Sequence, residues 1–229
     1  MNFCNKPIKS RSKYSDIYSP CCHKIQGHSQ KCEEYPFLNH LKKIDKRVAD
    51  KIKRDATMTT GAAWKSEDAG PNRILRWVML LEDEQLLDYG INMTELKPQV
   101  IDKLREKAAD YNTCVLVAAK LTWLVYQMID APIPPREISE YLESLFGPLK
   151  PATTVCVICK LPLSYKLFSV AERGKAAIET CHKNPRIHNP ENIGFGHREC
   201  NIAQGSKSLS EFYSWIQDIL KRLENSKSK

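Results

Sequence analysis

The chain has 229 residues, of which 42% are hydrophobic and 27% are charged, the ordinary mixture of a globular protein with one or two domains. A chain of this length buries roughly 70% of its unfolded surface, so its core needs no disulfide bonds. Its longest apolar stretch, residues 114–129, is interrupted by polar side chains and is shorter than the ~20 residues of a membrane span. Because no signal peptide opens the sequence, we expect a soluble, cytoplasmic protein without a membrane partner.

The net charge of +8 comes from the two ends of the chain. Residues 151–229 carry 12 Lys and Arg against 7 Asp and Glu, residues 1–40 carry 6 against 3, and residues 41–150 carry 17 of each. Both basic ends contain clusters of Cys and His, and in a reducing compartment clustered cysteines are more often metal ligands than disulfides. This distribution favours a polyanion such as nucleic acid as the partner.

Hydrophobic periodicity predicts a helical unit in the middle of the chain. The first helix is expected from Phe37 to Ile52, and a loop interrupted by Gly and Pro follows over 56–72. Further helices are predicted at about 72–89, at 94–111 with Thr94 as the N-cap, at 113–130, and from Pro135 to Leu145. The core of this unit is expected to include Trp77, Leu116, Leu121 and Trp123.

Beyond residue 150 the sequence pattern changes, and it predicts short β-strands and turns in a segment that also contains Cys and His residues. A last amphipathic helix is predicted from Leu209 to Glu224, with Trp215 on its apolar side and in the core. The fold class is therefore predicted as α+β and mostly helical. We expect a basic Cys/His-rich segment over 1–40, a helical domain for core, DNA recognition or dimerisation over 41–150, and a domain that carries the chemistry over 151–229.

Two pairs of Cys and His residues in the C-terminal segment have the spacing of zinc ligands. Cys156-Val-Ile-Cys159 is followed, 38 residues after Cys159, by His197-Arg-Glu-Cys200. A two-residue gap lets one tight turn present both of its ligands, and four such ligands complete a tetrahedral zinc. We interpret the four residues as a closed Cys3His site of the structural kind, in which metal binding is coupled to folding. The alternative is two unrelated pairs.

Between and after these pairs lie Ile178-Glu-Thr-Cys-His182-Lys-Asn-Pro185, then Asn192, then Cys200-Asn201, with Gly205 four residues later. This pattern resembles the HNH nuclease family over about residues 153–210. The resemblance implies a ββα-metal finger, in which two antiparallel strands and a helix surround a metal ion. It also implies a metal-dependent DNA endonuclease, and the length and layout of the chain resemble a small Type II restriction endonuclease.

The resemblance implies a role for each residue of the motif. His182 would be the general base that deprotonates water, a task that suits an imidazole with an unperturbed pKa near 6.5. Asn192 would brace the loop that orients His182. Asn201, in place of the family's third His, would hold a catalytic Mg2+ or similar ion through its side-chain oxygen. The expected cofactors are therefore a structural Zn2+ and a catalytic divalent cation.

One position departs from the family pattern, because Cys181 stands where many members have an Asp that binds the metal. Glu179 could supply the missing carboxylate; alternatively, one protein ligand and the phosphate would hold the metal. Strand alternation places Glu179 on the opposite face from His182 unless a bulge intervenes, which makes Glu179 the weaker candidate.

Positive side chains flank the proposed site and are expected to contact DNA phosphates. They are Lys183, Arg186, Arg198 and Lys207. His188 lies in a loop, and we expect it to face solvent or phosphate rather than to act in catalysis. The long loop around Trp64, which includes Lys65, Asn72 and Arg73, could read DNA bases, although an ordinary surface loop is the alternative.

Six potential metal ligands lie within 29 residues near the N-terminus. They are Cys4, Cys21, Cys22, His23, His28 and Cys32. They could form a second zinc site in a segment with few core residues, although the spacing matches no diagnostic pattern. The alternative is a mobile basic arm with incidental cysteines, and either form could bind nucleic acid.

The leading hypothesis is a sequence-specific endonuclease that hydrolyses phosphodiester bonds in double-stranded DNA. A homodimer is expected, because palindromic targets match two-fold dimers. A homing or phage-type HNH nicking enzyme is the close alternative, although the repeated DNA-reading modules of homing enzymes are not visible. The alternative from another class is a zinc-finger nucleic-acid-binding protein whose HNH fold has lost catalysis.

Overall fold

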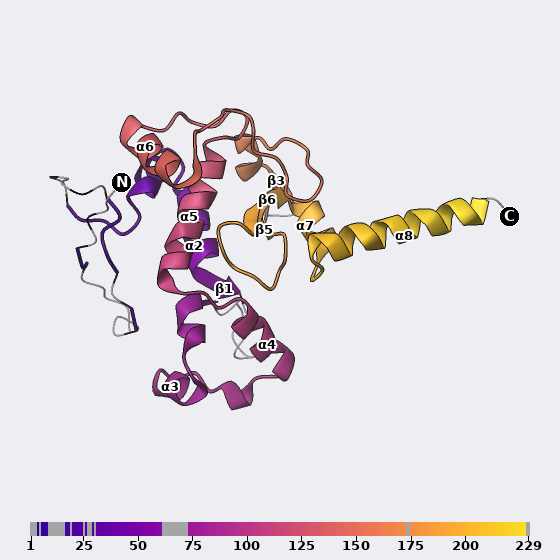
Figure 1. Cartoon of the computed structure of the whole chain (residues 1–229), viewed down its shortest axis with the longest axis horizontal. Coiled ribbons are helices and arrows are strands. Elements are labelled where there is room, and N and C mark those ends of the chain that lie inside the picture. Colours follow the sequence, from indigo (N-terminus) through magenta and orange to yellow (C-terminus); the bar gives the residue numbers. More distant parts are fainter. Residues whose placement is uncertain are drawn as a thin grey trace.

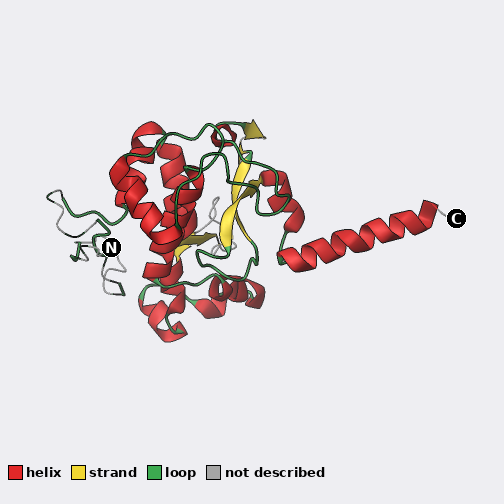
Figure 2. Cartoon of the chain, turned by 45° about the horizontal axis from the view of Figure 1, so that its top comes forward, coloured by secondary structure: helices red, strands yellow, loops and turns green. Residues whose placement is uncertain are grey.

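The computed structural model describes residues 4, 6–8, 17–18, 20–24, 26, 29, 31–60, 73–172 and 175–227. Helices dominate this part of the chain, and three two-stranded antiparallel sheets accompany them (Figures 1 and 2). The prediction of a mostly helical α+β fold with a C-terminal hairpin and a terminal helix is confirmed. Within the same residues, none of the helices combines the length and the apolar character that a bilayer span requires.

The first predicted helix is divided at Asp45. A 3-10 turn over Pro36–Leu38 leads into α1 (Asn39–Ile44), and α2 then covers Lys46–Thr57. Asp45 has an extended backbone, and its carboxylate accepts a hydrogen bond of 3.0 Å from the backbone N–H of Arg47, so it caps the start of α2. The chain therefore forms two short helices where the apolar pattern predicted one.

The prediction of a single helix over 72–89 is wrong. Strand β2 (Arg73–Leu75) pairs antiparallel with β1 (Met58–Thr60), a 3-10 turn covers Arg76–Leu80, and only α3 (Asp83–Asp88) is α-helical. Periodicity cannot distinguish a short buried strand from a helix, and pairing with β1 decides the matter here. The proposed base-reading loop with Trp64, Lys65 and Asn72 lies outside the described residues, as does the side chain of Arg73.

The next two helices are shorter than predicted. After a 3-10 turn over Met93–Glu95, α4 covers Pro98–Glu106 and begins at a proline, with Lys97 rather than Thr94 at the N-cap. Helix α5 (Tyr111–Val125) begins where the Asp110 carboxylate accepts a hydrogen bond of 2.9 Å from the backbone N–H of Thr113.

Helix α6 (Arg136–Phe146) starts after Pro135, as predicted, and ends at Gly147 with a positive φ of 86°. Helices α2 and α6 both pack against α5, which is the central helix of the fold (Figure 1).

The expected core residues of the helical unit divide into buried and exposed ones. Trp77 and Leu121 are buried as predicted, and Trp123 is half-buried with its indole N–H donating to the Gly147 carbonyl at 3.0 Å. Leu116 is 38% exposed, so its predicted core position is wrong.

The C-terminal segment folds as a hairpin followed by two helices. A 3-10 turn over Tyr165–Phe168 and the short pair β3 (Ala171–Glu172) and β4 (Lys175–Ala176) come first. Strand β5 (Ile178–His182) then pairs with β6 (Ile193–His197), and α7 (Arg198–Gln204) begins at the next residue. The last helix, α8 (Leu209–Lys227), extends away from the body of the molecule (Figures 1 and 2).

One hydrophobic core joins the helical and C-terminal segments. Ile178 and Phe195 of the β5–β6 hairpin belong to the same buried cluster as the residues of α2 and α5, and Phe212 joins it from the first turn of α8. Because α8 then leaves the body, Trp215 is 43% exposed, and its predicted place in the core is wrong.

The described part of the N-terminal segment lies against the helical body. The Cys4 N–H donates to the Lys24 carbonyl at 2.8 Å, and the His23 N–H donates to the Glu33 carbonyl at 3.0 Å. The ring of Tyr18 stacks on that of Tyr111, with 4.9 Å between the centroids. Aromatic packing therefore anchors this segment to α5.

Candidate active site and metal centre

The four predicted zinc ligands come together at one end of the hairpin. Cys156 and Cys159 flank a tight turn, His197 ends β6, and Cys200 lies in the first turn of α7. Their donor atoms all lie within 4.8 Å of one another, and 3.3 Å separates Cys159 Sγ from His197 Nδ1. Tetrahedral zinc with 2.3 Å bonds places its sulfur ligands roughly 3.8 Å apart, so this group, which we call the C-terminal cage, fits a metal of that kind.

The cage depends on a glycine in β6. A Cβ atom at Gly196 would lie 2.8 Å from Cys181 Sγ and 3.2 Å from Cys156 Sγ. Cys181 itself is buried beside the cage and is not one of its four ligands; burial raises the pKa of its thiol. The residue that replaces the family's Asp is therefore a packing residue with a neutral thiol.

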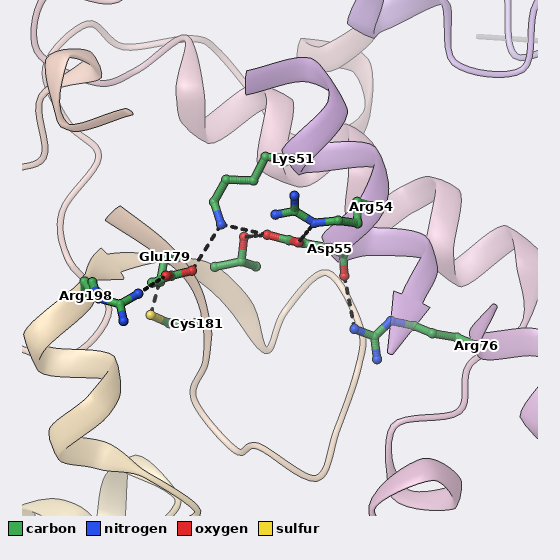
Figure 3. A network of polar contacts seen from close by, with 8 residues as sticks. Lys51, Arg54, Asp55, Arg76, Glu179, Cys181 and Arg198 are labelled. Carbon is green, nitrogen blue, oxygen red and sulfur yellow. Dashed lines mark hydrogen bonds and ion pairs between the residues drawn. The ribbon is translucent and has the colours of Figure 1, made fainter. Parts of the chain in front are cut away.

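The register of the hairpin decides where Glu179 points. Strands β5 and β6 pair residue by residue from Ile178–His197 to His182–Ile193, with no bulge. One oxygen of the Glu179 carboxylate accepts a hydrogen bond of 2.8 Å from Arg198, and the other lies 3.2 Å from Lys51 Nζ (Figure 3). Two cations therefore engage Glu179, the weaker of the two predicted metal ligands.

Helix α2 contributes a second carboxylate to this region. Asp55 accepts hydrogen bonds of 2.9 Å from Lys51 Nζ, 2.8 Å from Arg54 Nε and 2.9 Å from Thr180 Oγ1. Figure 3 shows these side chains of α2 meeting the hairpin. Burial raises the pKa of Asp55, but Lys51 and Arg54 outweigh it and hold that pKa below the usual value.

His182 lies at the end of β5 and contacts a second imidazole. Its Nε2 is 3.1 Å from Nδ1 of His188, and His188 Nε2 lies 2.8 Å from the backbone oxygen of Ala56. Burial, together with the charges of Arg76 and Lys107, lowers the pKa of His182 to about 3 and that of His188 to about 2. His188 is only 5% exposed, so the expectation that it faces solvent or phosphate is wrong.

Asn192 holds the loop between the two strands. Its side-chain oxygen accepts a hydrogen bond of 2.8 Å from the Asn184 N–H, and its amide donates to the carbonyls of Asn184 and Ile187 at 2.8 and 2.6 Å. His182 ends the strand that precedes this loop, and His188 lies within the loop. These contacts are the ones that a loop-bracing role requires.

A cavity of about 790 Å³ opens where the hairpin faces α2. His182 and Asn201 both line it, so the predicted base and the predicted metal ligand share one cavity. Cationic side chains outnumber carboxylates in the lining. The cations are Arg47, Lys51, Arg54, Arg76 and Lys107, and the carboxylates are Asp55 and Glu179. Such a lining attracts an anion.

Arg76 is fixed in the wall of this cavity. Two of its guanidinium nitrogens donate to the backbone oxygens of Lys107 and Asp55 at 2.9 and 3.0 Å. Its Nε, and Oγ1 of the neighbouring wall residue Thr59, are buried without a hydrogen-bond partner among the described residues. Because a buried polar group without a partner costs free energy, these two atoms are unsatisfied groups within the wall of the cavity.

The four predicted phosphate contacts have different surroundings. Lys183 and Arg186 are exposed, and Arg186 lies 3.6 Å from Glu106. Lys207 lies over the ring of Trp215, 5.0 Å from its centroid, and Arg198 is held by Glu179. Sequence reasoning missed the contribution of α2, which no local motif marks.

Part of the predicted N-terminal ligand set also comes together. Sγ atoms of Cys4, Cys22 and Cys32 lie within 4.8 Å of one another, with 4.0 Å between Cys4 and Cys32. Cys21 Sγ instead lies 3.7 Å from His23 Nε2, and His23 Nδ1 is 2.8 Å from the Glu34 backbone oxygen. His28 lies outside the described residues.

Comparisons with known proteins support the prediction of a type II restriction endonuclease. Residues 34–200 match the DraIII family. The chain is also similar to a solved structure described as the crystal structure of a type II restriction endonuclease, with 48% sequence identity and a TM-score of 0.84 over 98% of this chain and 99% of that one. No curated protein matches the chain. The match covers most of the chain, so this protein belongs to the DraIII family of type II restriction endonucleases.

Proposed function

We propose that this endonuclease cuts double-stranded DNA at a specific sequence by a one-metal mechanism of the HNH type, with its catalytic centre in the cavity between α2 and the β5–β6 hairpin. The observation that carries the proposal is that His182 and Asn201 line the same basic cavity, next to a Cys3His cage. In this reading, β5, β6 and α7 are the two strands and the helix of a ββα-metal finger.

The chain's own groups supply binding, orientation and a base. His182 takes the proton of the attacking water, whose oxygen forms a bond to phosphorus while the ester P–O bond breaks. The phosphate brings negative charge beside His182, which raises the pKa of the imidazole from its low value and so strengthens it as a base. Asn192 keeps the loop and the His182 ring in place.

Asn201 is the residue that would hold the catalytic divalent cation, through its side-chain oxygen. Amide oxygen is a hard donor that suits Mg2+, and it leaves the other coordination positions to water and phosphate. The cation would supply positive charge for the phosphate and the leaving oxygen. Glu179 is the less favoured second ligand, because Arg198 and Lys51 already engage its carboxylate.

The C-terminal cage would hold a structural zinc through Cys156, Cys159, His197 and Cys200. Three sulfurs and one imidazole nitrogen are the donor set of closed zinc sites, and the fit of their spacing supports this choice. The metal would stabilise the end of β6 and the start of α7, which carries Asn201.

A second zinc is proposed for Cys4, Cys22 and Cys32, whose thiols suit the same metal. The site would tie residues far apart in the N-terminal segment to one point. The neighbouring Cys21 and His23 contact each other instead and are not assigned to this site.

Phosphates of the DNA backbone would be bound by the cations of the cavity and its rim. Of the predicted contacts, Lys183 and Arg186 are exposed and Lys207 is half-buried and forms no ion pair among the described residues, whereas Arg198 is paired with Glu179. The helical segment over 41–150, whose positive and negative charges balance, would contribute sequence recognition or dimerisation.

A homodimer is proposed because the described chain holds one His182–Asn201 pair, and cutting both strands of a duplex requires two such pairs. Helix α8 would supply the dimer contact, since it leaves the body with Trp215 and Leu220 exposed. Light scattering of the purified protein should give twice the chain's 26.3 kDa. Replacing Leu220 with Asp should yield monomers, and a monomeric wild-type protein would contradict the proposal.

Digestion of a plasmid of known sequence tests the function. The wild type should yield discrete fragments with Mg2+, and His182→Ala should bind the same DNA without cutting it. His40→Ala is the matched control, because His40 contacts Tyr126 away from the cavity and should not be required for cutting. A wild type that binds DNA but never cuts it with Mg2+, Mn2+ or Ni2+ would instead be a binding protein.

A further inference from the structure

We propose that His188 is a positioning residue that fixes which nitrogen of His182 carries the proton. In this arrangement His182 carries hydrogen on Nε2, and its Nδ1 is the basic nitrogen that faces the reaction. The inference rests on the proposed role of His182 as general base, and it adds a residue to which the HNH resemblance assigns no function.

The first step of the argument is the bond between His188 and α2. Ala56 lies in the last turn of α2, where backbone carbonyls have no partner within the helix. A carbonyl oxygen can only accept, so the contact of 2.8 Å requires that His188 Nε2 carries the hydrogen. The helix end thus selects the tautomer of His188.

The second step of the argument is that the tautomer of His188 determines the tautomer of His182. A neutral imidazole has one N–H, so with hydrogen on Nε2 the Nδ1 of His188 is an acceptor. The contact of 3.1 Å between this Nδ1 and His182 Nε2 then needs a donor, and His182 must supply it from Nε2. The lone pair of His182 is left on Nδ1.

The competing arrangement has a charged His188 that donates from both nitrogens. His188 is 5% exposed and has Arg76 and Lys107 nearby, and both effects act against a second positive charge. Among the described residues, no carboxylate contacts the ring nitrogens of His188, which face Ala56 and His182. The neutral chain from Ala56 to His182 is therefore the favoured one.

The arrangement also links α2 to the proposed base, His182, through His188. Helix α2 ends against His188, and the loop braced by Asn192 carries His188 back to the end of β5. The orientation of His182 thus depends on a backbone atom more than a hundred residues earlier in the chain.

Two substitutions separate positioning from structural support. In His188→Gln the side-chain amide nitrogen can still donate to Ala56, but no acceptor remains where Nδ1 stood. In His188→Asn the side-chain oxygen takes the place of Nδ1 and can accept from His182, while the bond to Ala56 is lost. If His188 only supports the structure, the Gln variant should have the higher kcat of the two. If His188 positions His182, the Asn variant should have the higher kcat.

We expect His188→Gln to lower kcat roughly 10- to 100-fold, the range found when a partner that orients an active-site ligand is removed, with KM for DNA unchanged. His188→Asn should recover most of kcat even if its melting temperature is lower. Equal kcat for the Gln variant and the wild type, with a slower Asn variant, would overturn the inference.

Nitrogen-15 NMR of the wild-type protein at neutral pH gives a readout that does not depend on any substitution at His188. The His182 signals, identified by their loss in His182→Ala, should show hydrogen on Nε2 and a lone pair on Nδ1. Hydrogen on Nδ1 would overturn the inference. Failure of the proposed function would look different, because the wild type itself would then not cut DNA with Mg2+.

Discussion

The carboxylate of Asp55 in α2 accepts a hydrogen bond of 2.9 Å from the hydroxyl of Thr180 in β5, although 125 positions separate the two residues. Lys51, one turn earlier in α2, and Arg54, the preceding residue, bind the same carboxylate, and Lys51 also pairs with Glu179 (Figure 3). The two walls of the cavity are therefore joined by a charged network rather than by apolar contacts alone.

Replacing Asp55 with Asn should destabilise the fold by about 2 kcal/mol, because Lys51 and Arg54 would lose a partly buried charged partner. The pKa of Asp55 is depressed in the folded protein, so its contribution is present above the unfolded value near 3.9 and is lost as pH falls through the folded one. Urea unfolding at pH 7, well above the unfolded pKa, should show the full difference between variant and wild type.

Asp50→Asn is the matched control, since Asp50 pairs with Lys46 on the exposed face of the same helix. It should cost no more than about 0.5 kcal/mol at pH 7. An Asp55 variant as stable as this control at pH 7 would contradict the importance of the network.

Gly196→Ala should weaken metal binding at the C-terminal cage. The added Cβ would meet Cys181 and Cys156 Sγ at distances that require one of them to move, and Cys156 is a ligand. We expect zinc to be lost to a chelator at a lower chelator concentration than in the wild type. Gly90→Ala is the control, because nothing lies within 4 Å of its Cβ and only its φ of 75° is unfavourable. Equal zinc retention in both variants would show that the cage tolerates the methyl group.

Zinc content distinguishes the N-terminal cluster from incidental cysteines. Elemental analysis of the intact protein should give two zinc ions per chain, and Cys32→Ser should leave one. Cys21→Ser is a close control, because Cys21 is the neighbour of Cys22 but contacts His23 instead of the cluster. One zinc per chain in the wild type would dismiss the second site.

Local spacing was sufficient to predict which Cys and His side chains come together and which end of the chain carries the proposed catalytic residues. The ligand pairs Cys156–Cys159 and His197–Cys200 are set by a tight turn and by a strand that runs directly into a helix, so sequence distance determines spatial distance. His182 and Asn201 follow from the same hairpin and helix, and the structure brings both to one cavity.

The other wall of the cavity could not be predicted in this way. Lys51 and Asp55 lie in an amphipathic helix where charges at this spacing are usually exposed ion pairs, and only tertiary packing turns them toward Thr180. His188 was misjudged for the same reason, since its partner is a backbone carbonyl that no side-chain pattern reveals. The strand at Arg73–Leu75 was missed because its pairing partner decides its conformation.

Acid should destabilise the protein through the two contacting imidazoles. The folded-state pKa values of His182 and His188 lie well below the unfolded value near 6.5, so below pH 6.5 the unfolded chain binds protons that the folded chain does not. Stability therefore falls as pH falls, by about 1.4 kcal/mol per pH unit for each histidine. Urea unfolding between pH 6 and pH 4 should show a shallower loss of stability for His188→Asn than for the wild type, and parallel losses would contradict a neutral His182–His188 pair.

Arg76 tests whether the cavity binds the reacting phosphate. Its guanidinium is fixed by the Lys107 and Asp55 carbonyls, and its buried Nε has no acceptor among the described residues. Arg76→Lys keeps the charge but removes the fork of donors, so kcat at saturating DNA should fall about 100-fold, as when a preorganised donor to a developing negative charge is removed. Arg105→Lys is the matched control, because Arg105 also donates to a backbone carbonyl, that of Met79, but lies outside the cavity lining. Both variants should lose similar stability in urea. If they also retain similar kcat, Arg76 supports the fold and does not touch the phosphate.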